Sequence, residues 1–293
     1  MNADGSGRRQ LTSDGNSTNP LFTPDKSKIL FNKNTKLYSI NVDGTGTTEL
    51  SSNAIEQSIS PNGNNILYAY FSSDLQIWRM GIDGSSPSQV TSIGTDTWGA
   101  KYLPNGTQFL FASNAATGRS TLEDIYIGNV DGSGTPTRLT SAESSYNNYY
   151  PAISYDGTKF AYYSWGRTHS NVWVRNINGS SPVNISGNDY ASDDSMPSIS
   201  YDGTKVVFNS NRTGTQEVYS ANIDGTNLTK LTSIGKNIKP QFLPNGQILF
   251  SSDRDGKVQL YVMDADGNNQ TRISDNTNND GDGQESNPDK PSF

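Results

Sequence analysis

The residues whose types and spacing come closest to a chemical site stand near the C-terminus of the chain. Oxygen-bearing side chains alternate there before a glycine and a later carboxylate, in the order Asn278, Asp280, Asp282, Gly283 and Asp289. Hard cations such as Ca²⁺ take oxygen ligands from a loop of this kind, with a carboxylate at its twelfth position. This loop departs from the usual pattern, because Asn comes first and Asp comes last. We therefore predict a calcium site here, with a polar terminal tail as the competing interpretation.

Constellations that could perform catalysis are few. The sequence has no nucleophile elbow of the form Gly-x-Ser-x-Gly, which excludes a fused peptidase domain of that kind. A Ser-His-Asp triad would depend on His169, since this is the one histidine in the chain. Glycosidases need two carboxylates facing each other across the substrate. The carboxylates available for such a pair are Glu123, Asp124, Asp193 and Asp194.

Composition and charge narrow the class of protein. The 293 residues carry a net charge of −7, which argues against nucleic-acid binding because a duplex would repel such a surface. The chain has no cysteine, so neither disulfides nor thiolate zinc sites can stabilise it. No apolar stretch is long enough to span a membrane, and the first residues lack the features of a signal peptide. Because Met1 falls inside a repeat, we expect a mature or trimmed chain.

Two turn signals recur along the sequence and define a repeat. The first turn occurs as Pro24-Asp25-Lys26, Pro61-Asn62-Gly63, Pro104-Asn105-Gly106, Tyr155-Asp156-Gly157, Tyr201-Asp202-Gly203 and Pro244-Asn245-Gly246. The second occurs between these as Asp43-Gly44, Asp83-Gly84, Asp131-Gly132, Asn178-Gly179, Asp224-Gly225 and Asp266-Gly267. Such pairs supply the positive φ that tight hairpins need. Short runs rich in aromatic and β-branched residues separate the turns, so each repeat predicts four strands, which is one propeller blade.

The repeat resembles that of TolB-like proteins. The resemblance rests on Met196-Pro197-Ser198-Ile199-Ser200-Tyr201-Asp202-Gly203-Thr204-Lys205-Val206-Val207-Phe208, with Ser251-Ser252-Asp253-Arg254-Asp255-Gly256 and Leu260-Tyr261-Val262-Met263-Asp264. It occurs six times over essentially the whole chain. It implies an all-β, six-bladed propeller of four-stranded antiparallel blades, usually periplasmic or exported and often a platform for protein interaction. Related propellers accompany peptidase domains or carry a lyase site, but the lyase needs a histidine cluster that this chain lacks.

The ends of the chain leave the closure of the ring open. We expect residues 1–274 to form a single propeller and residues 275–293 to form a polar acidic tail, whose end resembles the start of a further repeat. We predict that residues 9–12 close the ring as the outer strand of the last blade, with Arg272-Ile273-Ser274 as the competing strand. A seven-bladed ring, or a piece of a longer array, remains an alternative.

One face of the propeller is expected to carry the binding site. The glycine turns share a face that we expect to be short and chemically plain, whereas the longer loops and the connections between blades share the opposite face. Candidate binding residues on the loop-rich face are Trp98, Tyr146, Tyr149, Tyr150, Trp165, Arg167, His169, Asp193, Asp194, Arg212 and Arg254. Packing between blades for the aromatic residues, and bracing of loop carbonyls for the two arginines near the third strands, are the competing interpretations.

These observations predict a monomeric, extracytoplasmic, non-catalytic interaction module of TolB-like type that recognises a protein or peptide partner. The alternative is a carbohydrate-binding propeller with glycan lyase or hydrolase activity. A trimmed scaffold without native activity is a third interpretation.

Overall fold

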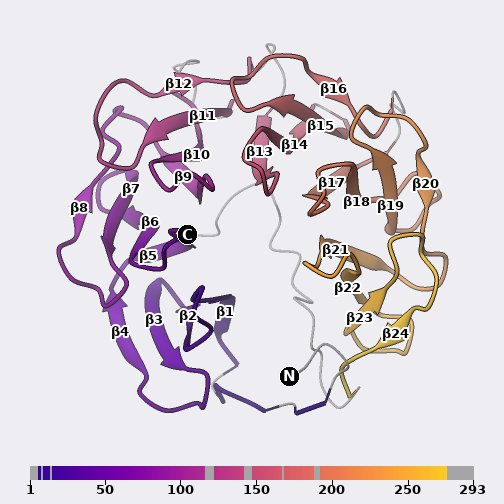
Figure 1. The fold of residues 1–293 in the computed structure, drawn as a ribbon, viewed down its shortest axis with the longest axis horizontal. Helices are drawn as coiled ribbons and strands as arrows, with labels where there is room; N and C mark the ends of the chain where they lie inside the picture. Colours follow the sequence, from indigo (N-terminus) through magenta and orange to yellow (C-terminus); the bar gives the residue numbers. More distant parts are fainter. Residues whose placement is uncertain are drawn as a thin grey trace.

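The chain forms a six-bladed β-propeller (Figure 1). The structure is a computed structural model that describes residues 6–7, 9–13, 15–115, 122–141, 147–166, 168–187 and 192–275. All regular secondary structure in these ranges is β-strand, arranged as six four-stranded antiparallel sheets around a central axis. The sequence-based prediction of the fold is therefore confirmed.

Each blade contributes one inner strand beside the axis and a second strand next to it. The inner strands are β1 (Ser17–Phe22), β5 (Ala54–Ile59), β9 (Thr97–Tyr102), β13 (Asn147–Ile153), β17 (Asp194–Ile199) and β21 (Asn237–Phe242). The second strands are β2 (Lys28–Lys33), β6 (Asn65–Phe71), β10 (Gln108–Ser113), β14 (Lys159–Trp165), β18 (Lys205–Ser210) and β22 (Ile248–Ser252).

The third and outer strands complete the blades. The third strands are β3 (Lys36–Asn41), β7 (Leu75–Gly81), β11 (Asp124–Asn129), β15 (Ser170–Asn176), β19 (Glu217–Asn222) and β23 (Gln259–Met263). The outer strands are β4 (Thr48–Ser51), β8 (Ser88–Gln89), β12 (Thr137–Arg138), β16 (Val183–Asn184), β20 (Thr229–Lys230) and β24 (Thr271–Arg272).

The Asp-Gly turns fix the hairpins through side-chain hydrogen bonds. In the fifth blade, Asp202 Oδ1 accepts hydrogen bonds from Ser200 Oγ and from the Thr204 amide, at 2.6 and 3.0 Å. Gly203 follows with φ of 70°, a backbone conformation that costs glycine little. Because the turn is closed on both sides, the register of β17 against β18 is set locally.

Every inner strand contains a β-bulge with one residue in the left-handed conformation. These residues are Asn19, Glu56, Gly99, Tyr150, Met196 and Lys239, with φ between 50° and 66°. Only one of them is glycine, and the conformation costs other residues about 1–2 kcal/mol each. Packing of the surrounding blades therefore holds the bulges in place, and each bulge re-aims a side chain beside the axis.

The second strands form the centre of the core. Most of their apolar residues are almost completely buried, among them Leu67, Phe109, Phe160, Phe208 and Phe250. The largest buried cluster runs without interruption from the second blade to the fifth. Neighbouring blades thus share one apolar interior, as blades with two buried faces require.

The glycine turns of the third and outer strands pack against the preceding blade. A Cβ atom on Gly179 would lie 2.7 Å from the carbonyl oxygen of Leu139, and one on Gly267 would lie 3.0 Å from that of Leu231. These positions therefore need glycine both for the positive φ and for the close approach of backbone.

The last blade takes a different outer strand from the one predicted from the sequence. The outer strand of the last blade is β24, which pairs with β23, so the competing segment forms it. A strand that follows its partner through a short hairpin closes a much shorter loop than one from the other end of the chain. Residues 9–13 lie outside any strand and contact the first blade.

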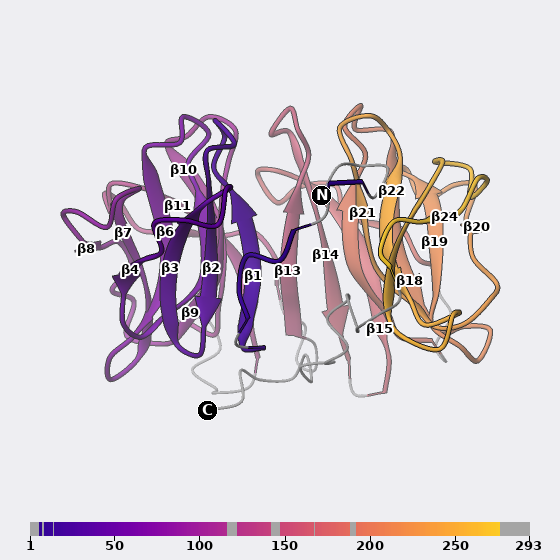
Figure 2. The same cartoon turned by 90° about the horizontal axis from the view of Figure 1, so that it is seen from below.

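These N-terminal residues pack against the glycine turn of the first blade, at the position where the preceding blade packs in the other repeats. Leu11 lies beside Gly44 and joins the small apolar cluster of Ile29, Phe31 and Ile40, just as Leu231 lies beside Gly267. Arg9 donates a 2.6 Å hydrogen bond to the carbonyl of Val42. The N-terminal segment therefore lies between the first and last blades (Figures 1 and 2).

Candidate functional site

The propeller has two faces, which Figure 2 shows at its upper and lower edges. We call the face with both kinds of glycine turn the turn face, and the opposite face, with the connections between blades, the loop face. Tyr146 and Arg167, both predicted to bind, lie outside the described residues, as do the predicted calcium ligands Asn278, Asp280, Asp282 and Asp289. The remaining candidates lie on inner strands or at the loop face.

Three of the predicted aromatic residues meet beside the central axis. The ring centroid of Trp98 on β9 lies 5.5 Å from those of both Tyr149 and Tyr150 on β13. Tyr163 on β14 completes the group, with its ring stacked 5.9 Å from that of Tyr150. We call these four residues the aromatic cluster. Trp98, Tyr149 and Tyr163 are buried and Tyr150 is half-buried, so Tyr150 is the member that offers surface to a ligand.

Charged groups stand next to this cluster. Burial raises the pKa of Tyr150 above its ordinary range, and the charges of Glu56 and Glu123 raise it further. The Glu56 carboxylate accepts a 2.8 Å hydrogen bond from the Gly99 amide. Surrounding protein atoms raise the pKa of Glu56 and lower that of Lys101, although water reaches both side chains. The cluster therefore combines an aromatic wall with opposite charges held near the axis.

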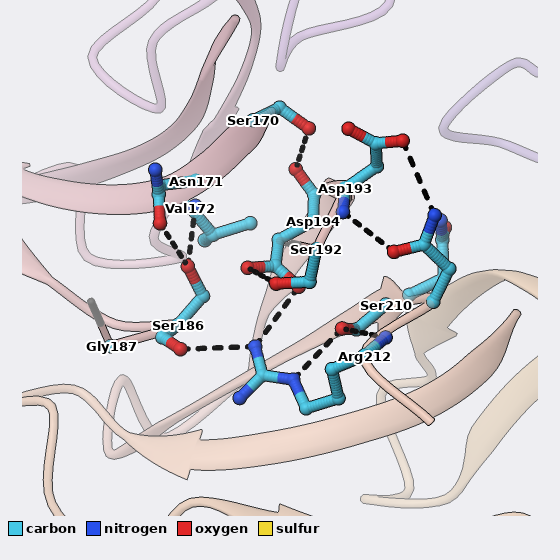
Figure 3. Close-up of polar contacts among 12 residues, drawn as sticks. Ser170, Asn171, Val172, Ser186, Gly187, Ser192, Asp193, Asp194, Ser210 and Arg212 are labelled. Atoms are coloured by element: carbon cyan, nitrogen blue, oxygen red, sulfur yellow. Dashed lines mark hydrogen bonds and ion pairs between the residues drawn. The ribbon is translucent and has the colours of Figure 1, made fainter. Parts of the chain in front are cut away.

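Arg212 is engaged within the protein (Figure 3). Its guanidinium donates 2.9 Å hydrogen bonds to Asp194 Oδ1 and Ser210 Oγ, and a 3.0 Å bond to the Ser186 carbonyl. It also lies 4.8 Å from the ring centroid of Tyr219. Asp194 is fully buried, and burial raises its pKa against the opposing effects of Ser210 and Arg212. Both residues of the pair belong to the fifth blade, and the bond from Arg212 to the Ser186 carbonyl connects them to the fourth.

Arg254 repeats this arrangement one blade later. Its guanidinium lies 4.6 Å from the ring centroid of Tyr261 and donates a 2.9 Å hydrogen bond to Asn237 Oδ1. Asn237 begins β21 as Asp194 begins β17, so a neutral amide stands where the previous blade has a carboxylate. Both arginines therefore have contacts that suit the bracing interpretation.

The remaining described candidates are Asp193, His169 and Trp165. The Asp193 backbone amide donates a 2.7 Å hydrogen bond to Asn211 Oδ1, and Asn211 Nδ2 donates a 3.2 Å bond to the Asp193 carboxylate. His169 is buried, with Nδ1 lying 3.0 Å from Thr168 Oγ1. Trp165 is half-buried at the end of β14.

Two of the carboxylates considered for a glycosidase-like pair, Asp124 and Asp194, are buried and bonded to other protein groups. Asp124 is fully buried and accepts hydrogen bonds from Arg138, Thr140 and Asn148 at 2.8, 2.8 and 3.0 Å. It therefore ties β11 to the outer strand of its own blade and to the next blade. Asp194 lies at the next junction, between the fourth and fifth blades. The two carboxylates therefore belong to different junctions.

The described residues contain no group of three or more His, Asp or Glu side chains placed to hold a metal ion. The predicted calcium loop falls outside that search and stays a prediction. Within the described ranges no helix is long and apolar enough to cross a membrane.

Sequence reasoning missed several residues of interest. Glu56 and Lys101 gave no motif, because their proximity depends on inner strands of two different blades. A second aromatic group lies at the outer rim, where a groove of about 450 Å³ between the first two blades is lined in part by Tyr68, Tyr70 and Trp78. The turn face, expected to be plain, carries the exposed pair Tyr155 and Tyr201.

The fold and the repeat define a class of β-propeller built from tandem four-stranded units. A family model described as the TolB beta propeller domain matches residues 124–290, which is more than half of the chain. The chain therefore belongs to the TolB beta-propeller family.

Solved structures support the same fold. A protein from Agrobacterium tumefaciens that carries the TolB name is 21% identical over 82% of this chain and 88% of its own, with a TM-score of 0.62. TolB from Acinetobacter baumannii is 18% identical over 85% of this chain and 60% of its own, with a TM-score of 0.60. An oligogalacturonate lyase from Vibrio parahaemolyticus is 14% identical over 87% and 79%, with a TM-score of 0.67. At these identities the likeness concerns the fold alone.

Proposed function

We propose that this propeller is a non-catalytic, extracytoplasmic binding module that holds a protein or peptide partner at the loop face, beside the central axis. The observation that carries the proposal is the aromatic cluster, with half-buried Tyr150 close to the charges of Glu56 and Glu123. Rigid aromatic residues provide contact area at low entropic cost, which is why they dominate the energetic centres of protein interfaces. Membership in the TolB family favours interaction over turnover.

The strain at Tyr150 supports a role in binding. Its φ of 50° places a bulky residue in a conformation that glycine occupies at the same position of the preceding blade, Gly99. Strained residues of this kind cluster at ligand-binding sites, although here the bulge recurs in every blade. The identity of the residue at the bulge, and not the bulge itself, therefore distinguishes this blade.

Replacing Tyr150 by glycine tests the proposal, because glycine suits the backbone and removes the ring. Peptides are first selected from a displayed library against the wild-type chain, and their affinities are then measured for Tyr150→Gly. The matched control is Met196→Gly, the same bulge position one blade later and away from the cluster. We expect a loss of about tenfold or more for Tyr150→Gly and little change for Met196→Gly. Equal affinities for the two variants would contradict the proposal.

A second candidate function is carbohydrate binding, with or without glycan lyase or hydrolase activity. The rim groove favours it, because Tyr70 and Trp78, whose ring centroids lie 5.2 Å apart, both line it. Saturable binding on a glycan array that is lost in Trp78→Ala would support this function. If glycan binding were lost in Tyr150→Gly and not in Trp78→Ala, the ligand of the aromatic cluster would be a glycan and not a peptide.

A further inference from the structure

Two tyrosines form an exposed pair of closely packed, tilted rings on the turn face. Tyr155 and Tyr201 are 63% and 48% exposed, and their ring centroids lie 3.9 Å apart. They stand in the turns between the inner and second strands of neighbouring blades, the fourth and the fifth. The hydrogen bond between their hydroxyls raises the pKa of Tyr201. The pair therefore presents a large aromatic surface on the face opposite the aromatic cluster.

The same repeat position holds proline in the other four blades. The prolines of the first three blades are seated on the glycine of the next turn, as Pro24 on Gly63, Pro61 on Gly106 and Pro104 on Gly157. No described atom lies within 4 Å of the side-chain position of Gly203, next along the ring. Tyr155 thus contacts the ring of Tyr201 in the next turn and not the glycine of that turn, so this junction presents aromatic rings where the others have a proline on a glycine.

The turns beneath the two rings are rigid. Asp156 accepts a 2.6 Å hydrogen bond from Ser154 Oγ and a 3.0 Å bond from the Thr158 amide, and Asp202 does the same in its own turn. A ligand that binds the tyrosines therefore does not need to order their backbone, which lowers the entropic cost of association.

The surroundings of the pair are acidic. Hydrogen bonds, first of all from Ser154 and Ser200, lower the pKa of Asp156 and Asp202, so both exposed carboxylates stay ionised under mildly acidic conditions. Lys159 donates a 2.9 Å hydrogen bond to Asn176, and its charge contributes to the lowered pKa of Asp156, whose Oδ2 also accepts a 2.8 Å bond from Thr158 Oγ1. Further turn aspartates with lowered pKa stand at corresponding hairpins of the same face, namely Asp25, Asp43, Asp83, Asp131, Asp224 and Asp266.

The chain itself shows which group suits an aromatic ring beside a carboxylate. The Arg212 guanidinium lies over Tyr219 while pairing with Asp194. Arg254 lies over Tyr261 in the next blade. A guanidinium stacks on an aromatic face and donates to a carboxylate at the same time, which an ammonium does less well.

We propose that the Tyr155–Tyr201 pair, with Asp156 and Asp202 beside it, is a second docking surface that seats an arginine side chain of a partner protein. The guanidinium lies against an outer ring face and donates to the neighbouring carboxylate. The net charge of −7 draws such a basic segment toward the molecule. This surface is separate from the loop face and does not depend on the function proposed there.

The double variant Tyr155→Pro/Tyr201→Pro tests this inference. Proline is the residue of the other four blades at this position, so the turns keep a residue that the repeat accepts, and the net charge does not change. The probe is an alternating glycine–arginine octapeptide with blocked ends, titrated by calorimetry or NMR against both proteins. A glycine–lysine octapeptide of equal charge measures the unspecific attraction. The control variant is Ile234→Ser, which removes an equally exposed apolar residue from the loop face.

We expect the arginine peptide to bind the wild-type chain more tightly than the lysine peptide, and to lose about fivefold or more in affinity in the double variant. The lysine peptide should change little, and Ile234→Ser should bind both peptides as the wild-type chain does. Equal affinity of the arginine peptide for wild-type and double-variant chains would overturn the inference. So would an equal loss for both peptides, or a preference of the tyrosine pair for a neutral oligosaccharide over the arginine peptide.

Discussion

The carboxylate of Glu56 on the second blade accepts a 2.8 Å hydrogen bond from the amide of Gly99 on the third. The donor is a bulge residue of an inner strand, so the contact joins two blades beside the axis. Surrounding protein atoms make this partly exposed carboxylate less favourable when ionised, so its titration couples the stability of the ring to pH.

Replacing Glu56 by glutamine should remove this dependence. The pKa of Glu56 is raised above its usual 4.5 in the folded chain, so the unfolded chain releases the proton first as the pH rises. Stability is then lost between the unfolded and folded pKa values and stays lower above them. We expect the melting temperature of Glu56→Gln, relative to wild type, to rise as the pH increases from about 4 to about 7. A difference that stays constant over this range would contradict the prediction.

The two bracing arginines should differ in their contribution to stability. Arg212→Ala leaves Asp194 buried without its guanidinium, which we expect to cost about 3–5 kcal/mol. Arg254→Ala leaves the neutral amide of Asn237, for which we expect a cost of about 1–3 kcal/mol. Urea denaturation at neutral pH measures both free energies of unfolding.

Acidification supplies the control for this comparison. Burial raises the pKa of Asp194, and losing Arg212 raises it further, so the orphaned carboxyl is more readily protonated. The deficit of Arg212→Ala should therefore shrink toward pH 4, whereas that of Arg254→Ala should not. Equal deficits for both variants at every pH would refute the role of the charge.

The close approach of turns to the preceding blade predicts unequal effects of two alanine substitutions. Gly203→Ala meets no described atom within 4 Å, so its cost is the positive φ alone, about 1 kcal/mol. Gly179→Ala adds a collision with the Leu139 backbone, and we expect about 3 kcal/mol in total. Chemical denaturation measures the free energies of unfolding of the two variants. Similar values would mean that the backbone near Leu139 moves at little cost to make room for the added methyl group.

The N-terminal segment should stabilise the first blade less than an outer strand stabilises its neighbour. Leu11 is half-buried against the first blade, whereas Leu231, in the corresponding seat, is buried. We expect Leu11→Ala to cost about 1 kcal/mol and Leu231→Ala about 2–4 kcal/mol. Thermal unfolding of the two variants measures the difference in stability. A larger loss of stability for Leu11→Ala would show that the N-terminal segment stabilises its blade more than the outer strand does.

Much of the fold could be predicted because its determinants are local. The turn at Asp202-Gly203 specifies a hairpin through bonds within five residues, and the same signal recurs in most blades. The closing strand was harder to predict, because residues 9–12 and 272–274 carry similar sequences. Which of the two segments forms the outer strand of the last blade depends on the length of the loop that each would close.

The candidate site was only partly predictable. Trp98, Tyr149 and Tyr150 were identified as aromatic residues near blade junctions, and the structure brings them together. Glu56 and Lys101 could not be found, because their proximity arises from the side-by-side placement of β5 and β9. The exposure of Tyr201 was equally hidden, since the sequence does not reveal that proline and tyrosine pack differently at the same turn.

Five successive pairs of inner strands pack on one another from β1 to β21, and within the described residues no comparable packing joins β21 back to β1. Leu21 and Phe22 on β1 are correspondingly exposed. The ring of inner strands is thus open between the sixth and the first blade. Because the ladder hydrogen bonds of each sheet lie within one blade, the gap between the sixth and first blades can widen or narrow without breaking these ladders.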